Sequence, residues 1–213
     1  MHPAETPFPV RLFAGAFLAC IVPAACGAQA VERVPVVGGP CQGCEAVFVG
    51  MPDSLSWRAR IAPADEPGDP LVLRGTVRDA GGEPAPGVVV YAYHTDAGGE
   101  YPPDDDFTGY ARRHGELRGW ARTDGDGRYR FDTIRPGSYP GRDNPAHVHL
   151  HVVEPGCCTY WIESVRFLDD PLLGDTADVP GRGRGGSGLV DPRREDGAWI
   201  AERDIVLRQG VSR

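Results

Sequence analysis

The sequence has no excess of basic residues and no long helical pattern. Its 213 residues carry a formal net charge of -8, and this charge argues against nucleic acid as a partner because a phosphate backbone would repel the chain. Aromatic and β-branched residues come in short runs, and the chain contains 29 glycines and 21 prolines. This composition favours many short strands joined by turns, in one domain with extensions.

The N-terminal apolar run is too short for a membrane span. Residues 12–25 are apolar but interrupted by glycine and proline, whereas a spanning helix needs about 20 apolar residues. Arg11 precedes the run and Ala28-Gln29-Ala30 follows it, a pattern that predicts an export signal over residues 1–30 and a periplasmic or extracellular protein. An uncleaved anchor is the alternative. Lipidation at Cys26 is a weaker alternative, because the leucine of a lipoprotein signal is missing three residues upstream.

Four cysteines would remain after cleavage: Cys41, Cys44, Cys157 and Cys158. In an exported domain they predict disulfides rather than free thiols. The Cys41-x-x-Cys44 spacing alone also suggests zinc or redox chemistry, but the adjacent second pair does not fit a zinc ribbon. A bridge between adjacent cysteines is strained, so two bridges joining the early pair to the late pair are geometrically easier. All three connectivities remain open from the sequence.

Strand patterns begin after a long irregular segment. Residues 31–70 are predicted to be an irregular N-terminal arm, with one short helical turn at 54–60. Residues 71–213 predict an all-β domain, a single β-sandwich of about seven to nine short strands with long irregular loops. The strands are expected at 71–78, 88–94, 117–123, 128–132, 146–153, 161–167 and 199–207.

One stretch concentrates the chemistry, because Tyr139 precedes the alternating histidines His147, His149 and His151. Strand side chains alternate between two faces, so the three histidines would share one face. His147 and His149 would then converge on one metal ion. His151 lies about 7 Å further along the strand and is expected outside the ligand set.

The sequence contains other histidines and tyrosines that are candidates for further metal ligands. His94 and His114 are predicted to be surface histidines. Tyr139 and Tyr101 each follow a glycine-containing turn, but a tyrosine in a β-protein is ordinarily part of the core or its rim. Two phenolates beside two neutral imidazoles would favour a trivalent ion such as Fe(III). Only a strongly Lewis-acidic metal keeps phenols, with an ordinary pKa of about 10, deprotonated near neutral pH.

Several separated motifs occur in one order along the chain. This order resembles the intradiol ring-cleavage dioxygenases, the catechol and protocatechuate group with its secreted branch, over roughly residues 71–170. The motifs are Leu73-Arg74-Gly75-Thr76-Val77, Tyr93-His94-Thr95-Asp96-Ala97-Gly98-Gly99-Glu100-Tyr101, Leu117-Arg118-Gly119, Gly127-Arg128-Tyr129-Arg130-Phe131 leading to Pro136-Gly137-Ser138-Tyr139-Pro140, and Pro145-Ala146-His147-Val148-His149. Any one of these motifs alone would be weak evidence for the family.

The resemblance implies a β-sandwich enzyme with non-haem Fe(III), which uses O2 to open a catechol-type ring between its two hydroxylated carbons. It implies four metal ligands, with Tyr139 as the axial ligand that leaves when the catecholate binds. The better-known members carry an arginine where this chain has Asn144, and Arg142 is the predicted substitute. The implied ligands are Tyr101, Tyr139, His147 and His149.

Two alternatives come from other classes of protein. The strand pattern of residues 75–90 also resembles transthyretin-like and carboxypeptidase-regulatory modules, which bind without catalysis but have no reason to keep the four ligands. The second alternative is a copper protein that uses the same histidines and tyrosines, because copper(II) also accepts both imidazole and phenolate ligands. The expected partners are a small catechol-type substrate and O2. No oligomer is inferred, because the helical N-terminal region used for dimerisation in the catechol dioxygenases is not found in this sequence.

Overall fold

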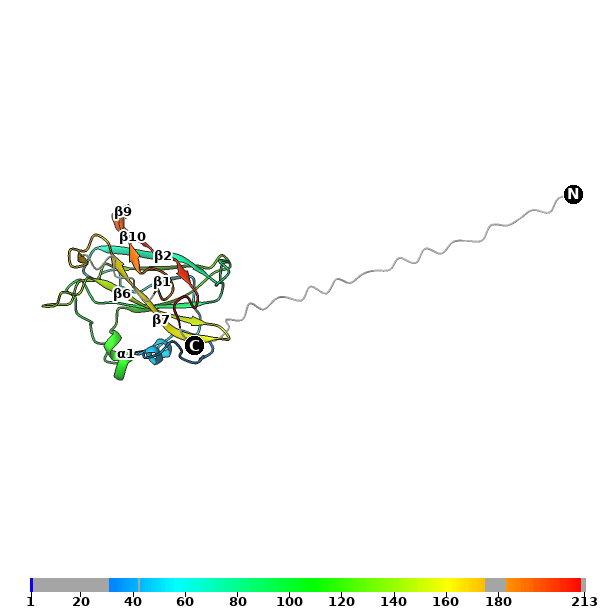
Figure 1. Ribbon diagram of the computed structural model, residues 1–213, viewed down its shortest axis with the longest axis horizontal. Helices are drawn as coiled ribbons and strands as arrows, with labels where there is room; N and C mark the ends of the chain where they lie inside the picture. The colour runs from blue at the N-terminus through cyan, green and yellow to red at the C-terminus, as the bar shows by residue number, and fades with distance from the viewer. Residues whose placement is uncertain (2–30, 42, 175–182, 212–213) are drawn as a thin grey trace.

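The computed structural model describes residues 1, 31–41, 43–174 and 183–211 (Figure 1). Nearly all of the predicted export signal, including Cys26, lies outside the described residues. The described chain is nearly all β, with one short α-helix and one 3-10 helix. The elements are η1 (Cys44–Phe48), β1 (Arg58–Arg60), β2 (Pro70–Arg78), β3 (Val89–Tyr93), α1 (Gly109–His114), β4 (Arg118–Arg122), β5 (Arg128–Ile134), β6 (His147–Glu154), β7 (Cys158–Phe167), β8 (Leu189–Val190), β9 (Arg193–Glu195), β10 (Ala198–Glu202) and β11 (Ile205–Val206).

The strands form two mixed sheets around a common core. One sheet has the order β1-β5-β2-β10-β9, with β11 also paired to β2, and the other has the order β4-β3-β6-β7-β8. Alternate residues of both sheets, such as Leu73 and Phe131 from the first and Leu150 and Ile162 from the second, are buried together in one cluster. This alternation is the period of two expected of strands with one face in the core.

The described strands number eleven, more than the seven to nine expected. The additional strands are short, because β1, β8, β9 and β11 have only two or three residues each. Segments of this length do not show a recognisable alternation in the sequence. In the described part of the chain, no helix is long and apolar enough to span a membrane.

The N-terminal arm is more regular than expected, and the helical turn predicted at 54–60 is wrong. Arg58–Arg60 is strand β1, which pairs in parallel with β5. Exposed arginines there flank the half-buried Ala59, a strand pattern with a period of two. The short helix of the arm is η1, which lies beside α1 at the lower edge of the view (Figure 1).

The predicted bridges between the two cysteine pairs are also wrong. The structure contains the disulfides Cys41–Cys44 and Cys157–Cys158. The arm brings Cys41 to His151 in the middle of β6. The later pair lies at the turn between β6 and β7, where the backbone N–H of Cys157 donates to Glu154. The two pairs are therefore kept apart by the length of strand between them.

His94 and His114 are not surface residues, contrary to the prediction. They are 0% and 3% exposed. Both ring nitrogens of His94 are hydrogen-bonded within the fold, and Nδ1 of His114 is hydrogen-bonded to the hydroxyl of Tyr91. Burial lowers the pKa of each imidazole to about 4. His94 follows β3 and His114 ends α1, and the arm covers His114, where a Cβ at Gly43 would lie 2.6 Å from its Nε2 atom.

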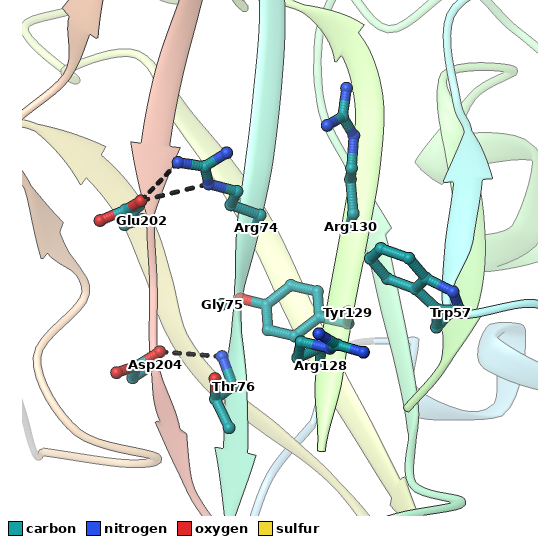
Figure 2. A pocket seen from close by; sticks show the side chains of 9 residues that line it. All are labelled: Trp57, Arg74, Gly75, Thr76, Arg128, Tyr129, Arg130, Glu202 and Asp204. Atoms are coloured by element: carbon teal, nitrogen blue, oxygen red, sulfur yellow. Dashed lines mark hydrogen bonds and ion pairs between the residues drawn. The ribbon is translucent and has the colours of Figure 1, made fainter. Parts of the chain in front are cut away.

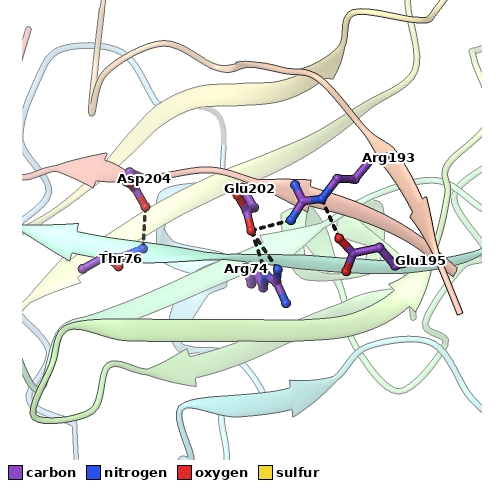
Figure 3. Close-up of polar contacts among 6 residues, drawn as sticks. All are labelled: Arg74, Thr76, Arg193, Glu195, Glu202 and Asp204. Carbon is purple, nitrogen blue, oxygen red and sulfur yellow. Dashed lines mark hydrogen bonds and ion pairs between the residues drawn. The ribbon is translucent and has the colours of Figure 1, made fainter.

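An ion-pair network joins three strands on the outer face of the first sheet (Figure 3). Glu202 of β10 accepts hydrogen bonds from Arg74 of β2 and Arg193 of β9, and Arg193 also donates to Glu195. These bonds connect β10 to both of its neighbours, β2, with which it pairs in parallel, and β9, with which it pairs antiparallel.

Candidate metal centre

Four donor atoms converge at one end of the second sheet. The hydroxyl of Tyr139 lies 2.7 Å from that of Tyr101, 3.0 Å from Nε2 of His147 and 3.5 Å from Nε2 of His149. The two Nε2 atoms are 3.1 Å apart. Tyr101 and Tyr139 come from two loops and the histidines from β6, so the fold brings together all four residues that the sequence singled out.

Close backbone packing holds the two tyrosine loops together. The N–H of Gly137 donates to the carbonyl of Asp96, and the hydroxyl of Thr95 donates to the carbonyl of Gly137 at 2.8 Å. A Cβ on Gly99 would lie 1.9 Å from the carbonyl oxygen of Ser138, and Gly99 has a φ of +86°. Only glycine permits both this approach and this conformation. The glycines before each tyrosine therefore set the distance between the two phenols.

A β-bulge orients the histidine strand. The pairing of β6 with β7 shifts register between Val148 and Leu150, so that Glu163 and Ser164 together lie opposite His149. The bulge brings the hydroxyl of Ser164 to 3.2 Å from Nδ1 of His149. Bulges often re-aim side chains in this way beside functional sites.

Both imidazoles are held through Nδ1, which leaves Nε2 for the cluster. Nδ1–H of His147 donates to the carbonyl of Pro145 at 2.8 Å, so Nε2 of the neutral ring carries the lone pair. Nδ1 of His149 is hydrogen-bonded to Ser164. Metal-binding histidines are generally oriented by such partners on the other nitrogen.

Burial disfavours the charged forms of His147, His149 and Tyr101. Burial lowers the pKa of His147, and burial together with the neighbouring His147 lowers that of His149 further, so both imidazoles are neutral ligands at neutral pH. Burial, followed by the hydrogen bond from Tyr139, raises the pKa of Tyr101 well above its ordinary value. A phenolate would therefore form at Tyr101 only beside a strong positive charge.

This donor set fits a hard, strongly Lewis-acidic cation. Phenolate oxygens favour such ions, and neutral imidazoles complete a mixed oxygen and nitrogen set. Ferric iron meets both requirements. The fit rests on the convergence of four donor atoms within hydrogen-bond distances, with both histidines presenting Nε2.

Aromatic side chains form the wall behind the ligands. The ring of Tyr93 stacks on His149 at 4.6 Å and on His114 at 3.7 Å between centroids. Tyr93 is buried and also packs near Tyr101. The stacked His114 behind Tyr93 had no signal in the sequence beyond an isolated histidine.

Arg142 and Asn144 lie on the exposed segment between Tyr139 and the histidine strand. The backbone N–H of Arg142 donates to the carbonyl of Tyr139 in a turn. Arg142 is exposed, and its predicted catalytic role remains a prediction. Buried His151 faces Cys41 and does not join the four-residue cluster.

A separate hollow of about 490 Å³ lies on the outer face of the first sheet (Figure 2). None of the four converging residues lines it. Its walls include Trp57 and the arginines Arg74, Arg128 and Arg130. Each of these arginines is paired with a carboxylate, from Glu202, Asp124 and Asp132 respectively. The hollow is thus a solvated ion-pair surface, and the chemistry of the molecule is concentrated on the other sheet.

Comparisons with known proteins agree with the geometry. A family model described as "Dioxygenase" matches residues 51–180. The chain belongs to the intradiol ring-cleavage dioxygenase family. It is 32% identical over 161 residues to the protocatechuate 3,4-dioxygenase beta chain of Burkholderia cepacia, covering 66% of this chain and 65% of that one. It is 38% identical over 104 residues to catechol 1,2-dioxygenase 1 of Acinetobacter lwoffii, covering 41% and 33%.

A solved structure shows the shared fold. The dioxygenase domain of a dioxygenase and carbohydrate-binding protein fusion from Streptomyces sp. SirexAA-E has a TM-score of 0.56 and 24% identity, covering 85% of this chain and 98% of that one. The intradiol dioxygenase chain described here spans less than two thirds of the length of either curated relative above. The family resemblance predicted from the ordered motifs is confirmed.

Proposed function

We propose that the chain is a non-haem Fe(III) dioxygenase that opens a catechol-type ring between its two hydroxylated carbons, with O2 as the second substrate. The observation that carries this proposal is the convergence of four donor atoms on the hydroxyl of Tyr139, which lies 2.7–3.5 Å from the donor atoms of Tyr101, His147 and His149. Family membership supports the same reaction type. The fold is proposed to be the single β-sandwich expected from the sequence, with residues 71–213 as its body.

Tyr101, Tyr139, His147 and His149 would hold the ferric ion, which would supply the Lewis acidity that orients and polarises the catecholate. Ring opening would add both oxygen atoms of O2 to give a muconate-type diacid. The residues of this chain supply the surroundings for that reaction. His147 and His149 would remain neutral ligands, because each is fixed through Nδ1. Tyr93 closes the wall behind His149.

Tyr139 is proposed to exchange with the substrate. Its hydroxyl contacts the other three donors. The phenolate oxygen of Tyr139 would take up one proton on release as the catechol loses one. Tyr101, which is held by the loop packing at Gly99, would stay in place.

The activity is tested by measuring oxygen uptake and the ring-opened product. Iron-loaded protein supplied with catechol should consume one O2 per ring opened, and both atoms of labelled O2 should appear in the diacid. Tyr101→Phe and His147→Ala should abolish both signals. Iron-loaded protein that binds catechol yet consumes no oxygen with any catechol-type substrate would contradict the proposed reaction. Protein that takes up copper(II) but not iron would favour the copper alternative, and protein that binds neither would favour the binding module.

Arg142 is proposed to compensate for the arginine missing at Asn144. Its turn is short and lies directly between Tyr139 and His147, so the guanidinium can approach the negative charge that develops on the ring. Arg142→Ala should reduce kcat at least about ten-fold while the iron content stays unchanged. Arg60→Ala, which removes an exposed arginine from the other sheet, is the matched control. Full turnover in Arg142→Ala would show that another group stabilises the negative charge on the ring.

Export remains a further proposal, and it places the protein in the periplasm or outside the cell. It is supported by the pattern of residues 1–30 and by the disulfides Cys41–Cys44 and Cys157–Cys158, which persist in oxidising compartments. A fusion of residues 1–30 to a reporter should be found outside the cytoplasm. Retention of that reporter in the cytoplasm would refute the proposal.

A further inference from the structure

The Cys41-x-x-Cys44 pair of the arm lies against a buried histidine that the metal centre does not use. Nε2 of His151 is 3.6 Å from Sγ of Cys41. This nitrogen and the two sulfur atoms of the pair all lie within 4.8 Å of one another. Cys44 and His151 are 1% and 3% exposed. A CxxC motif with a histidine 107 residues further on therefore forms one compact donor cluster.

The surroundings of His151 give its imidazole few polar contacts. Nδ1 has no hydrogen-bond partner among the described residues, and Nε2 faces a sulfur atom of a disulfide. A disulfide sulfur is a weak acceptor, so a buried imidazole gains little from it. If the two cysteines were thiolates bound to a cation, Nε2 of His151 would instead be a strong ligand of that cation.

The sulfur-to-nitrogen separation of one donor pair matches a tetrahedral metal site, and the two sulfur atoms, which are bonded to each other in the disulfide, would move apart on reduction. Zinc lies about 2.3 Å from thiolate sulfur and about 2.05 Å from imidazole nitrogen, so the two donors are separated by about 3.6 Å at the tetrahedral angle. The observed separation of Cys41 Sγ and His151 Nε2 is 3.6 Å. A pocket of about 350 Å³ is lined by Cys41, His151 and Trp161, and it gives a fourth ligand from solvent a way in.

We propose that Cys41, Cys44 and His151 form a second metal site, which takes a zinc-class divalent cation when the disulfide is reduced. Reduction by a phosphine converts the disulfide and one water into two thiols and the phosphine oxide. Binding of the cation then displaces the two thiol protons, leaving two thiolates and one neutral imidazole as ligands. The disulfide and the metal exclude each other, because both use the same two sulfur atoms.

This site is distinct from the proposed ferric centre, and it does not depend on the proposed function. Nε2 of His149 is directed to Tyr139, whereas Nε2 of His151 is directed to Cys41. The donors also differ in kind, because thiolates select soft or borderline ions and phenolates select hard ones. The ring of Tyr93 contacts both sites, with stacked contacts to His149 and His151.

The test uses cobalt(II) as the probe, because thiolate-bound cobalt absorbs in the near ultraviolet and phenolate- or imidazole-bound cobalt does not give that band. The full chain is reduced with a phosphine, desalted without oxygen and titrated with cobalt(II). One equivalent should produce the thiolate band, and zinc(II) should remove it. Unreduced protein should show no band, and this comparison needs no variant.

Variants assign the donors. Cys44→Ser and His151→Ala should each weaken cobalt(II) binding about ten-fold or more, while Cys157→Ser, in the other cysteine pair, should leave it unchanged. His147→Ala should keep the thiolate band, which separates this site from the ferric centre. Zinc(II) should also protect Cys41 and Cys44, and not Cys157, from alkylation in the reduced protein. A reduced wild-type chain without the thiolate band, or a band lost in Cys157→Ser but kept in His151→Ala, would overturn the proposal.

Discussion

At the scale of single residues, the orientation of two imidazoles decides what the centre can bind. His147 is fixed by the carbonyl of Pro145 and His149 by the hydroxyl of Ser164. Both Nε2 atoms then meet the two phenols. The four clustered residues could be predicted because histidines alternate along a strand and because the motifs keep their order. Ser164 could not be predicted, since the bulge that brings it to His149 depends on the pairing of two strands.

Ser164→Ala should weaken ferric binding about 10–100-fold, because His149 would lose the partner of its Nδ1 atom. The readout is the ferric dissociation constant from a competition titration with a chelator, together with the position of the visible absorption band. Ser164→Thr should restore most of the affinity, since it keeps the hydroxyl. Ser54→Ala, at an exposed position in the arm, serves as the control. Equal ferric affinity in Ser164→Ala and wild type would show that the hydrogen bond does not position His149.

At the scale of elements, the loops that carry Tyr101 and Tyr139 are joined more tightly than any pattern in the sequence indicates. A Cβ at Gly137 would lie 2.4 Å from the carbonyl oxygen of Ala97, and one at Gly99 would lie 1.9 Å from that of Ser138. The sequence marks both positions as turns, but a turn residue does not reveal which distant backbone it touches.

Gly99→Ala should separate the two tyrosine loops. The added methyl group would clash with backbone at a positive φ, so we expect a loss of about 1–3 kcal/mol in the free energy of unfolding and a weaker ferric site. Gly98→Ala is the matched control, because its Cβ would meet only the side chain of Asp96 at 3.3 Å. Chemical denaturation and iron stoichiometry measure the two effects. If Gly99→Ala were as stable and as iron-replete as Gly98→Ala, the loop packing would not set the site.

The ion-pair network of the first sheet should make stability depend on pH in the acid range. Hydrogen bonds from Arg193, and then from Arg74, lower the pKa of Glu202 to about 2 (Figure 3). Because the folded pKa is depressed, this stabilisation is present above the unfolded pKa of about 4.3 and is lost as the pH falls towards 2. The carboxylate is half exposed, so solvent screening limits its contribution to about 1 kcal/mol or less.

Glu202→Gln should therefore be less stable than wild type at pH 6, and the difference should shrink towards pH 2.5. Urea denaturation at both values measures it, with the exposed Glu83→Gln as the control. A difference that is the same at pH 6 and pH 2.5 would show that the carboxylate charge is not the stabilising feature.

At the scale of the whole molecule, two sheets share one core, and the chemistry lies at one end of the second sheet. The family, the all-β class and the resemblance to ring-cleaving dioxygenases could be predicted, because they rest on motifs along the chain. The disulfide pairing could not, since it depends on where the arm runs relative to β6 and β7. Burial of His94 and His114 likewise depends on loops that cover them from other parts of the chain.

The most direct measurement is a titration of the metal-free chain with ferric ion, followed by absorption spectroscopy. We expect one ferric ion per chain and a wine-red colour from tyrosinate-to-iron charge transfer, and the colour should shift when catechol is added. Tyr139→Phe should change the colour, and His147→Ala should abolish binding. A chain that stays colourless and binds no ferric ion, or a His147→Ala variant that retains a full complement of iron, would contradict the assignment of these four residues to one ferric centre.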